Sequence, residues 1–192
     1  MQPLVLGSTS PFRQALLEKL GIPFATDSPE IDETAQANET PEHLVARLAE
    51  AKARAVGQRH PNALVIGSDQ VACLDGEIVG KPGTYEKASH QLLRASGRDV
   101  VFHTGLCLLN TKSATAHVIV EPYTVKFRVL SDEQIARYLV QEKPYDCAGS
   151  FKSEGYGITL FRALEGRDPN SLVGLPLIAL IELLGLEGVQ LP

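Results

Sequence analysis

A short apolar run followed at once by small residues and a helix-start signature constrains the fold of this chain more than any other feature. The run covers residues 2–6, and Ser10 and Pro11 then stand where an N-cap and a first-turn proline are favoured. Apolar residues continue on one helical face as far as Gly21, the glycine expected after a helix. The segment therefore predicts a buried strand, a tight turn and a helix, a building block of α/β folds.

Strand and helix signals continue to alternate along the chain. Helices are expected where a cap precedes an amphipathic stripe and a glycine or proline follows it, at 41–57, 84–96, 131–143 and 176–184. Strands are expected at 63–67, 100–109, 115–129 and 156–161, with a hairpin at 71–79. We therefore expect a single domain over residues 1–192, with a mixed α/β sheet flanked by helices.

Composition excludes several classes of protein. The sequence has 18 Lys and Arg against 23 Asp and Glu, a net charge of −5, so it lacks the strongly basic surface of a nucleic-acid binder. No apolar run approaches the roughly 20 residues that span a bilayer, and the first residues lack a signal-peptide pattern. We expect a cytoplasmic protein that has no nucleic-acid or membrane partner.

The cysteines and histidines form no recognisable metal site. The three cysteines, Cys73, Cys107 and Cys147, are far apart and include no C-x-x-C pair. The five histidines include no H-E-x-x-H motif or pair four residues apart. The cysteines are therefore expected to be small core residues.

The loop before the first expected helix is a candidate phosphate site. Residues 7–13 place hydroxyls and backbone N–H groups at a helix N-terminus, with Arg13 on its first turn. Helix N-termini bind phosphate through these groups and the positive end of the dipole. Alternatively, Ser10 only caps the helix while Ser8 and Thr9 shape a tight bend, and the segment alone leaves both interpretations open.

Two carboxylate-bearing segments, 31–34 and 67–70, could hold a divalent cation or activate water. Asp69 is the stronger candidate for a functional carboxylate, because an acidic residue at the end of an apolar strand is unexpected unless it has a specific role. Asp32 and Glu33 can instead be solvated or capping residues. Carboxylates together with Lys and Arg, without a His or Cys site, favour metal-assisted phosphoryl chemistry over acyl transfer.

A lysine after a glycine at 80–82 resembles part of a P-loop. The spacing from Gly76 is one residue too short, and Pro82 replaces the Ser or Thr that would bind magnesium. We therefore exclude a P-loop, while Lys81 remains either a phosphate ligand or a solvated surface lysine.

Together these segments resemble the Maf family of nucleoside triphosphate pyrophosphatases over nearly the whole chain. The matching segments are S-x-S-P-x-R at 8–13, Asp-Glu at 32–33, the helix with Lys52, Gly-Ser-Asp at 67–69, Gly-Lys-Pro at 80–82 and Val-Gly-Leu-Pro at 173–176. The resemblance implies hydrolysis of a nucleoside triphosphate to the monophosphate and diphosphate, with magnesium or manganese as the divalent metal. It also implies a homodimer and an elongated, ITPase-like mixed α/β fold with a central cleft.

The same resemblance implies roles for individual residues. Asp69 would accept the proton of the attacking water, and Glu33 would position water or metal, so both are expected metal ligands. Contacts to the triphosphate are implied for four polar or cationic residues, Ser8, Arg13, Lys52 and Lys81.

Three positions depart from the family members that prefer pyrimidine nucleotides. Phe12, Gln70 and Glu154 stand where those members have Arg, Thr and Gln, and residues 148–155 resemble the subgroup acting on 7-methyl-GTP, its enterobacterial members in particular. A carboxylate such as Glu154 can accept from guanine N1–H and N2–H₂ together, and Phe12 can stack on the cationic methylated base.

Other interpretations remain open at these positions and for the chain as a whole. Phe12 can pack in a core, and Glu154 can be a surface charge. The chain can be a pyrophosphatase for dTTP or UTP, or a nucleotide-binding regulator of cell division.

Overall fold

The computed structural model describes residues 2–192. Its elements are, in chain order, β1 (Leu4–Leu6), α1 (Pro11–Glu18), β2 (Phe24–Thr26), α2 (Pro41–Gly57), β3 (Leu64–Leu74), β4 (Glu77–Val79), α3 (Tyr85–Ala95), β5 (Asp99–Asn110), β6 (Thr115–Phe127), α4 (Asp132–Glu142), η1 (Ala148–Ser150), η2 (Tyr156–Leu160), β7 (Phe161–Gly166), η3 (Pro169–Val173) and α5 (Leu177–Leu186). The three η elements are short 3₁₀ helices.

The strands form a seven-stranded mixed sheet in the order β2-β1-β3-β5-β6-β7, with β4 paired to β3. β1 is parallel to both β2 and β3, whereas β4 pairs antiparallel with β3 and β7 antiparallel with β6. The expected mixed α/β fold with flanking helices is therefore confirmed.

The described residues divide into two compact units. The first comprises residues 2–70, 104–121 and 167–192, and the second comprises 71–103 and 122–166. The chain passes from one unit to the other within β3, and again within β5 and β6. The expectation of a single domain stays a prediction.

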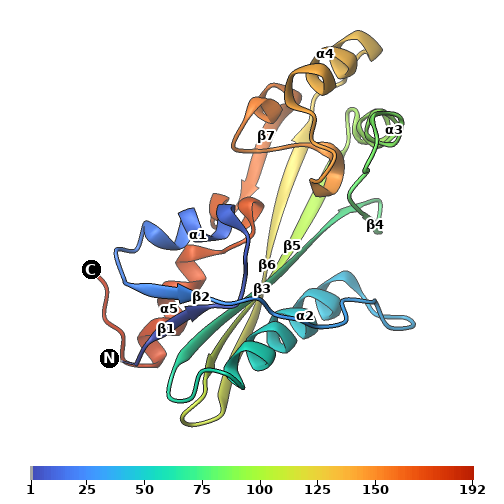
Figure 1. Ribbon diagram of the computed structural model, residues 1–192. Helices are drawn as coiled ribbons and strands as arrows, with labels where there is room; N and C mark the ends of the chain where they lie inside the picture. Colours follow the sequence, from blue (N-terminus) through green and yellow to red (C-terminus); the bar gives the residue numbers. More distant parts are fainter. Residues whose placement is uncertain (1) are drawn as a thin grey trace. The chain divides into compact units, whose positions relative to one another are not determined.

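Both faces of the sheet in the first unit are covered by helices. α1 and α5 pack on the face that carries Leu4, Leu64 and Ile66, and α2 packs on the opposite face against Val5 and Val65. Figure 1 shows α1 and α5 on one side of β1 and β3 and α2 on the other. The period-two alternation of β1 and β3 therefore assigns successive side chains to different helices.

The second unit has an aromatic core. Phe102, Phe127, Phe151 and Phe161 meet edge to face, with ring centroids 4.9 to 5.4 Å apart. Aromatic pairs favour this geometry because the positive ring edge meets the negative face.

The local signals for helix starts are confirmed. Ser10, Thr40, Thr84 and Ser131 each accept a hydrogen bond from the backbone N–H three residues on, and Ser131 and Gln134 form a capping box. The hairpin between β3 and β4 is confirmed as well. Its turn residues Asp75 and Gly76 both have positive φ, 52° and 82°, as a type I′ turn requires.

Two sequence-based expectations about strands are wrong. The strand expected to end at Gly67 continues to Leu74, so Ser68, Asp69 and Gln70 lie within β3 and not beyond its end. Residues 156–161 were expected to form the last strand, but 156–160 form η2 and the strand begins at Phe161.

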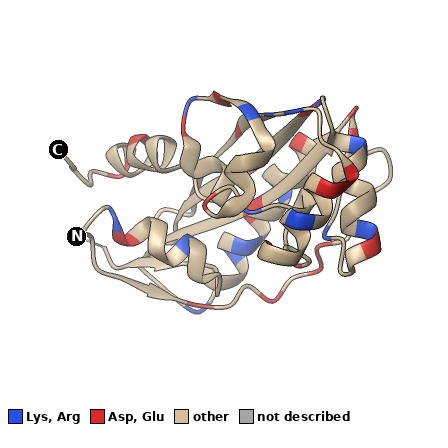
Figure 2. Ribbon diagram, turned by 90° about the horizontal axis from the view of Figure 1, so that it is seen from above, with Lys and Arg blue, Asp and Glu red and all other residues tan. Residues whose placement is uncertain are grey.

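The charged residues of both signs are interspersed along the ribbon, as Figure 2 shows.

Within the described residues, no helix is long and apolar enough to cross a membrane.

Candidate active site

A buried ion pair links α2 to the middle of β3. Lys52 Nζ lies 2.6 Å from Oδ1 of Asp69 and 2.9 Å from Oε1 of Glu33. The Lys52 and Asp69 side chains are only 7% and 10% exposed, whereas that of Glu33 is 57% exposed. One ammonium group therefore holds two carboxylates together, one from the sheet and one from a surface segment.

Two glycines allow α2 to approach the sheet closely enough for this contact. A Cβ on Gly67 would lie 2.1 Å from the carbonyl oxygen of Ala49, and one on Gly105 would lie 2.1 Å from that of Val45. Real Cβ atoms do not approach backbone so closely, so only glycine fits at either position. This close packing brings the stem of Lys52 over β3 beside Asp69.

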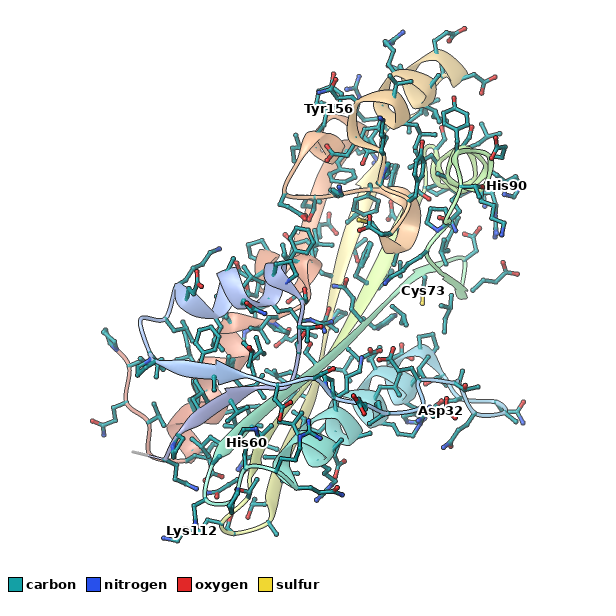
Figure 3. The ribbon with its side chains drawn as sticks, in the orientation of Figure 1. Asp32, His60, Cys73, His90, Lys112 and Tyr156 are labelled. Atoms are coloured by element: carbon teal, nitrogen blue, oxygen red, sulfur yellow. The ribbon has the colours of Figure 1, made fainter. Side chains whose placement is uncertain are left out.

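The segment that carries Glu33 is held by a local turn and by contacts to α2. Asp32, which Figure 3 labels on the extended segment between β2 and α2, accepts hydrogen bonds from the backbone N–H of Thr34 at 2.9 Å and its hydroxyl at 2.6 Å. Arg47 on α2 donates to the carbonyl of Thr34 at 3.1 Å and pairs with Glu39 at 2.6 Å. Asp32 therefore stabilises a local turn and caps no helix, and Glu33 follows it with its carboxylate on Lys52.

Arg13, on the first turn of α1, interacts electrostatically with the same carboxylates. Its Nε donates to the carbonyl of Gly174 at 2.9 Å. Burial lowers the pKa of Arg13 from its usual value, while the negative charges of Asp69 and Glu33 act in the opposite direction. Arg13 therefore contributes a second cation to the cluster around Asp69.

The serines before α1 have a structural role. Ser8 is buried, and its Oγ accepts from the N–H of Ser10 at 3.1 Å, while Ser10 Oγ accepts from the N–H of Arg13 at 3.4 Å. Each hydroxyl thus satisfies a backbone group in the turn, and Ser10 caps α1 as expected. A contact from Ser8 to phosphate stays a prediction.

The two residues that flank Asp69 in β3 point to the face opposite α2 and contact a later loop. Ser68 Oγ lies 2.8 Å from the carbonyl oxygen of Gly174. Gln70 Nε2 donates to the hydroxyl of Thr104 at 3.0 Å and to the carbonyl of Ser171 at 2.5 Å. Asp69 is thus fixed on both sides by strand neighbours whose side chains are held.

Comparison with known proteins places this architecture in a family. Residues 3–186 match the family described as Maf-like protein. The chain belongs to the Maf family.

Three curated relatives of this Maf chain carry the name 7-methyl-GTP pyrophosphatase. The relative from Nitrosococcus oceani is 60% identical over 96% of this chain and 93% of its own. Those from Alcanivorax borkumensis and Methylobacillus flagellatus are 57% and 55% identical over 98% and 99% of this chain, and over 96% and 99% of theirs.

Two solved structures are more distantly similar to this Maf chain. The Staphylococcus aureus Ham1 protein aligns with a TM-score of 0.47 at 16% identity, covering 66% of this chain and 72% of that protein. A HAM1 protein from Coxiella burnetii aligns with a TM-score of 0.46 at 20% identity, over 66% and 73%. TM-scores below 0.5 do not establish a shared fold.

The structure brings together most of the residues that the sequence indicates. Glu33, Lys52, Asp69 and Arg13 form one cluster in the first unit of the Maf chain, and Gln70 borders it. The exposure of Phe12 on α1, 45%, shows that core packing is the wrong interpretation of its side chain.

Lys81 and Glu154 belong to the second unit of the Maf chain, and their part in the site stays a prediction. Both are exposed, and Glu154 accepts a hydrogen bond from the hydroxyl of Ser153 at 3.2 Å. Gln91 on α3 donates to the carbonyl of Gly80 at 3.0 Å and also pairs with the hydroxyl of Ser150. One glutamine thereby fastens the loop before Lys81 to the segment that leads to Glu154.

Sequence reasoning gave no role to the residues that hold the site from the opposite face of the sheet. The Maf motif at 173–176 contains Gly174, whose carbonyl oxygen contacts both Arg13 and Ser68. Backbone carbonyls carry no residue-type signature, so the Val-Gly-Leu-Pro motif is the only sequence signal that indicates this loop.

Cys73 and Cys107 are buried core residues as expected, whereas Cys147 is only partly buried. Burial raises the pKa of Cys107 and of Cys147 to about 12 each, far from the range in which a thiolate is populated at neutral pH. Nucleophilic thiol chemistry at these two residues is therefore disfavoured.

Proposed function

We propose that this Maf chain hydrolyses 7-methyl-GTP to 7-methyl-GMP and diphosphate, and so removes modified nucleotides from the pool. Relatives that are 55 to 60% identical over nearly the whole chain support this substrate by their name. The observation that carries the chemistry is the buried carboxylate of Asp69, oriented by Lys52 at 2.6 Å and joined to Glu33 through the same ammonium.

Asp69 is the proton acceptor in this proposal. A water molecule attacks the α-phosphorus as Asp69 takes one of its protons, the new P–O bond forms, and the bond from the α-phosphorus to the bridging oxygen breaks. Diphosphate leaves with the electron pair of that bond, and the proton on Asp69 passes to solvent. A general base must have a fixed position relative to the water, which the interior of a strand provides.

Lys52 orients the base and offsets its charge. Two carboxylates beside a polyphosphate repel it unless a cation intervenes. The ammonium of Lys52 is that cation for Glu33 and Asp69 in the structure. A direct contact from Lys52 to the triphosphate belongs to the proposal.

The donor chemistry of this cluster fits a divalent cation. Magnesium is commonly bound by one or two carboxylates together with substrate phosphates, and Glu33 and Asp69 are two such carboxylates. Among residues 2–192 there is no group of three or more His, Cys, Asp or Glu that could hold a metal ion alone. Magnesium or manganese, when bound, would polarise the phosphoryl oxygens as a Lewis acid.

The remaining site residues would bind the two ends of the substrate. Arg13, Ser8 and Lys81 would contact the triphosphate, where the cations offset charge that develops on the leaving diphosphate. Phe12 would stack on the cationic 7-methylguanine and Glu154 would accept from its N1–H and N2–H₂. Because the amide nitrogen of Gln70 is engaged with Thr104 and Ser171, its carbonyl oxygen is the group that could meet the base.

A substrate panel tests the proposal. The protein is incubated with magnesium or manganese and 7-methyl-GTP, GTP, dTTP or UTP, and the products are separated by chromatography. We expect 7-methyl-GMP and diphosphate, with the highest kcat/KM for the methylated nucleotide. Release of orthophosphate alone, or a preference for UTP or dTTP, would overturn the assignment of substrate. Binding without turnover would favour a regulatory role.

Two variants separate chemistry from base selection. Asp69→Asn should abolish nearly all turnover without loss of the fold, because an amide cannot accept the proton. Glu154→Gln should reduce the preference for 7-methyl-GTP over GTP more than it reduces hydrolysis of GTP. Glu86→Gln, at an exposed carboxylate on α3 of the same unit, is the matched control and should leave the preference unchanged.

We also propose that the protein is cytoplasmic and forms a homodimer, as the family resemblance implies. Light scattering coupled to size-exclusion chromatography tests the dimer directly. A mass of one chain over the working concentration range would contradict it.

A further inference from the structure

The Maf motif at residues 173–176 lies in a loop to which no role in the reaction has been assigned. We call residues 168–176 the carbonyl loop. It includes η3 and connects β7 to α5 within the first unit.

The carbonyl loop holds site residues through its backbone oxygens. The carbonyl of Gly174 accepts from Arg13 Nε at 2.9 Å and lies 2.8 Å from Ser68 Oγ. The carbonyl of Ser171 accepts from Gln70 Nε2 at 2.5 Å and from Thr104 Oγ1 at 2.9 Å. A displacement of this loop would therefore move a cation of the cluster and both strand neighbours of Asp69 together.

One buried carboxylate gives the carbonyl loop its shape. Asp168 is 1% exposed, and its Oδ1 accepts from the backbone N–H of Asn170 at 2.8 Å and from Asn170 Nδ2 at 2.7 Å. Its Oδ2 accepts from the backbone N–H of Ile178 at 2.8 Å, in the first turn of α5. Both ends of the loop are thus fastened to a single side chain, by hydrogen bonds of the charge-assisted kind that are stronger than neutral ones.

Gly174, near the end of the carbonyl loop, has a restricted backbone conformation. Gly174 has φ 107° and ψ 15°, outside the region that L side chains adopt readily. A Cβ at this position would lie 3.1 Å from Arg13 Nε. The direction of the Gly174 carbonyl therefore depends on the loop as a whole.

We infer that Asp168 is a positioning residue for the hydrolysis, acting through the carbonyls of Gly174 and Ser171 on Arg13, Ser68 and Gln70. The inference rests on the proposed function. The carboxylate of Asp168 accepts hydrogen bonds from Asn170 and Ile178, neither of which is proposed to bind substrate. Its effect on turnover must therefore pass through the loop. Arg13 is proposed to offset charge that develops in the transition state, so misplacing it should affect kcat more than KM.

The test is steady-state kinetics of Asp168→Asn with 7-methyl-GTP. The isosteric amide turns an NH₂ group toward one of the backbone N–H groups that the carboxylate now accepts from. We expect kcat to fall roughly 10- to 100-fold, the range for a misplaced catalytic group, while KM changes by less than about 3-fold. Ser131→Ala is the matched control, because it removes the cap of α4 and should lower stability without lowering kcat.

A double variant shows whether the effect passes through Arg13. In an Arg13→Lys background, which keeps the charge but removes Nε, Asp168→Asn should lower kcat by less than about 3-fold, because coupled positions are not additive. Full additivity, or kinetics of Asp168→Asn that match those of Ser131→Ala, would overturn the inference.

The substrate assignment can fail independently of this inference. If the wild-type protein prefers another nucleotide, the same series is measured with that nucleotide. If it hydrolyses none, the proposed function fails, and hydrogen exchange of Asp168→Asn then decides. The inference requires faster exchange in residues 10–14 as well as 169–178, with residues 132–142 unchanged, and acceleration confined to 169–178 would overturn it.

Discussion

Lys52 and Asp69 form a buried ion pair in which Nζ lies 2.6 Å from Oδ1, and the same Nζ also lies 2.9 Å from the carboxylate of Glu33. Removing the lysine would leave the buried carboxylate of Asp69 without the cation that hydrogen-bonds to it, which costs roughly 3–5 kcal/mol. Removing the charge of Asp69 leaves Lys52 paired with Glu33. We therefore expect Lys52→Met to lower the free energy of unfolding more than Asp69→Asn does.

Urea unfolding of the two variants measures this asymmetry. Arg54→Met is the matched control on α2, because Arg54 is 51% exposed in an i,i+4 pair with Glu50, and exposed pairs contribute about 1 kcal/mol or less. Equal losses for Lys52→Met and Asp69→Asn would show that Glu33 does not hold the lysine.

The close approach of α2 to β3 predicts an intolerance to one methyl group. Gly67→Ala would place Cβ 2.1 Å from the carbonyl oxygen of Ala49, so α2 must shift away and carry Lys52 from Asp69. We expect a large drop in Tm together with loss of turnover. Gly185→Ala on α5 meets nothing within 4 Å and should raise stability by up to about 1 kcal/mol. Similar Tm values for the two variants would contradict the packing argument.

Divalent metal should bind weakly until nucleotide is present. The cluster offers the carboxylates of Glu33 and Asp69 but no third acidic, His or Cys ligand among the described residues. Substrate phosphates would supply the missing oxygens. Titration with manganese, followed by electron paramagnetic resonance, should show a markedly lower Kd when a non-hydrolysable 7-methyl-GTP analogue is bound. A tight manganese site in the nucleotide-free protein would contradict this expectation.

We expect the ionised carboxylate of Glu187, in the first unit, to contribute to the free energy of unfolding. Hydrogen bonds from Asn110 at 2.5 Å and then from His117 at 2.8 Å lower the pKa of Glu187, against the opposing effect of burial. Its folded pKa lies below the unfolded value of about 4.3, so the contribution is present above that pH and is lost as the pH falls through the folded pKa. Wild-type stability should therefore fall more steeply below about pH 4.3 than that of Glu187→Gln, by urea unfolding from pH 6 to pH 3. Parallel curves would show that Glu187 contributes nothing.

Local chemistry accounts for the elements that could be predicted from the sequence. The caps at Ser10, Thr40, Thr84 and Ser131 and the Asp75-Gly76 turn depend on a few neighbouring residues, and the structure confirms them. The cluster of Asp69, Lys52, Glu33 and Arg13 was reached through motif resemblance, since their separations along the chain hide their proximity.

The errors occur where tertiary contacts override local pattern. The polar run 67–70 is typical of a loop, yet it continues β3 because Ser68, Asp69 and Gln70 each find partners far away in the sequence. Alternating Tyr156, Ile158 and Leu160 suggest a strand, but Tyr156 and Ile158 are exposed, at 47% and 55%, and only Leu160 is buried. The residue types of a short sequence segment do not indicate either environment.

The place of Asp69 within the eleven residues of β3 also limits how the gene can change. Successive side chains of a strand point to opposite faces, so losing or gaining one residue between Leu64 and Asp69 would exchange the faces of every residue beyond it. Asp69 would then turn toward α1 and α5, and Ser68 or Gln70 would meet Lys52. Insertions and deletions can accumulate in the connections of this chain, but β3 can vary only by substitution.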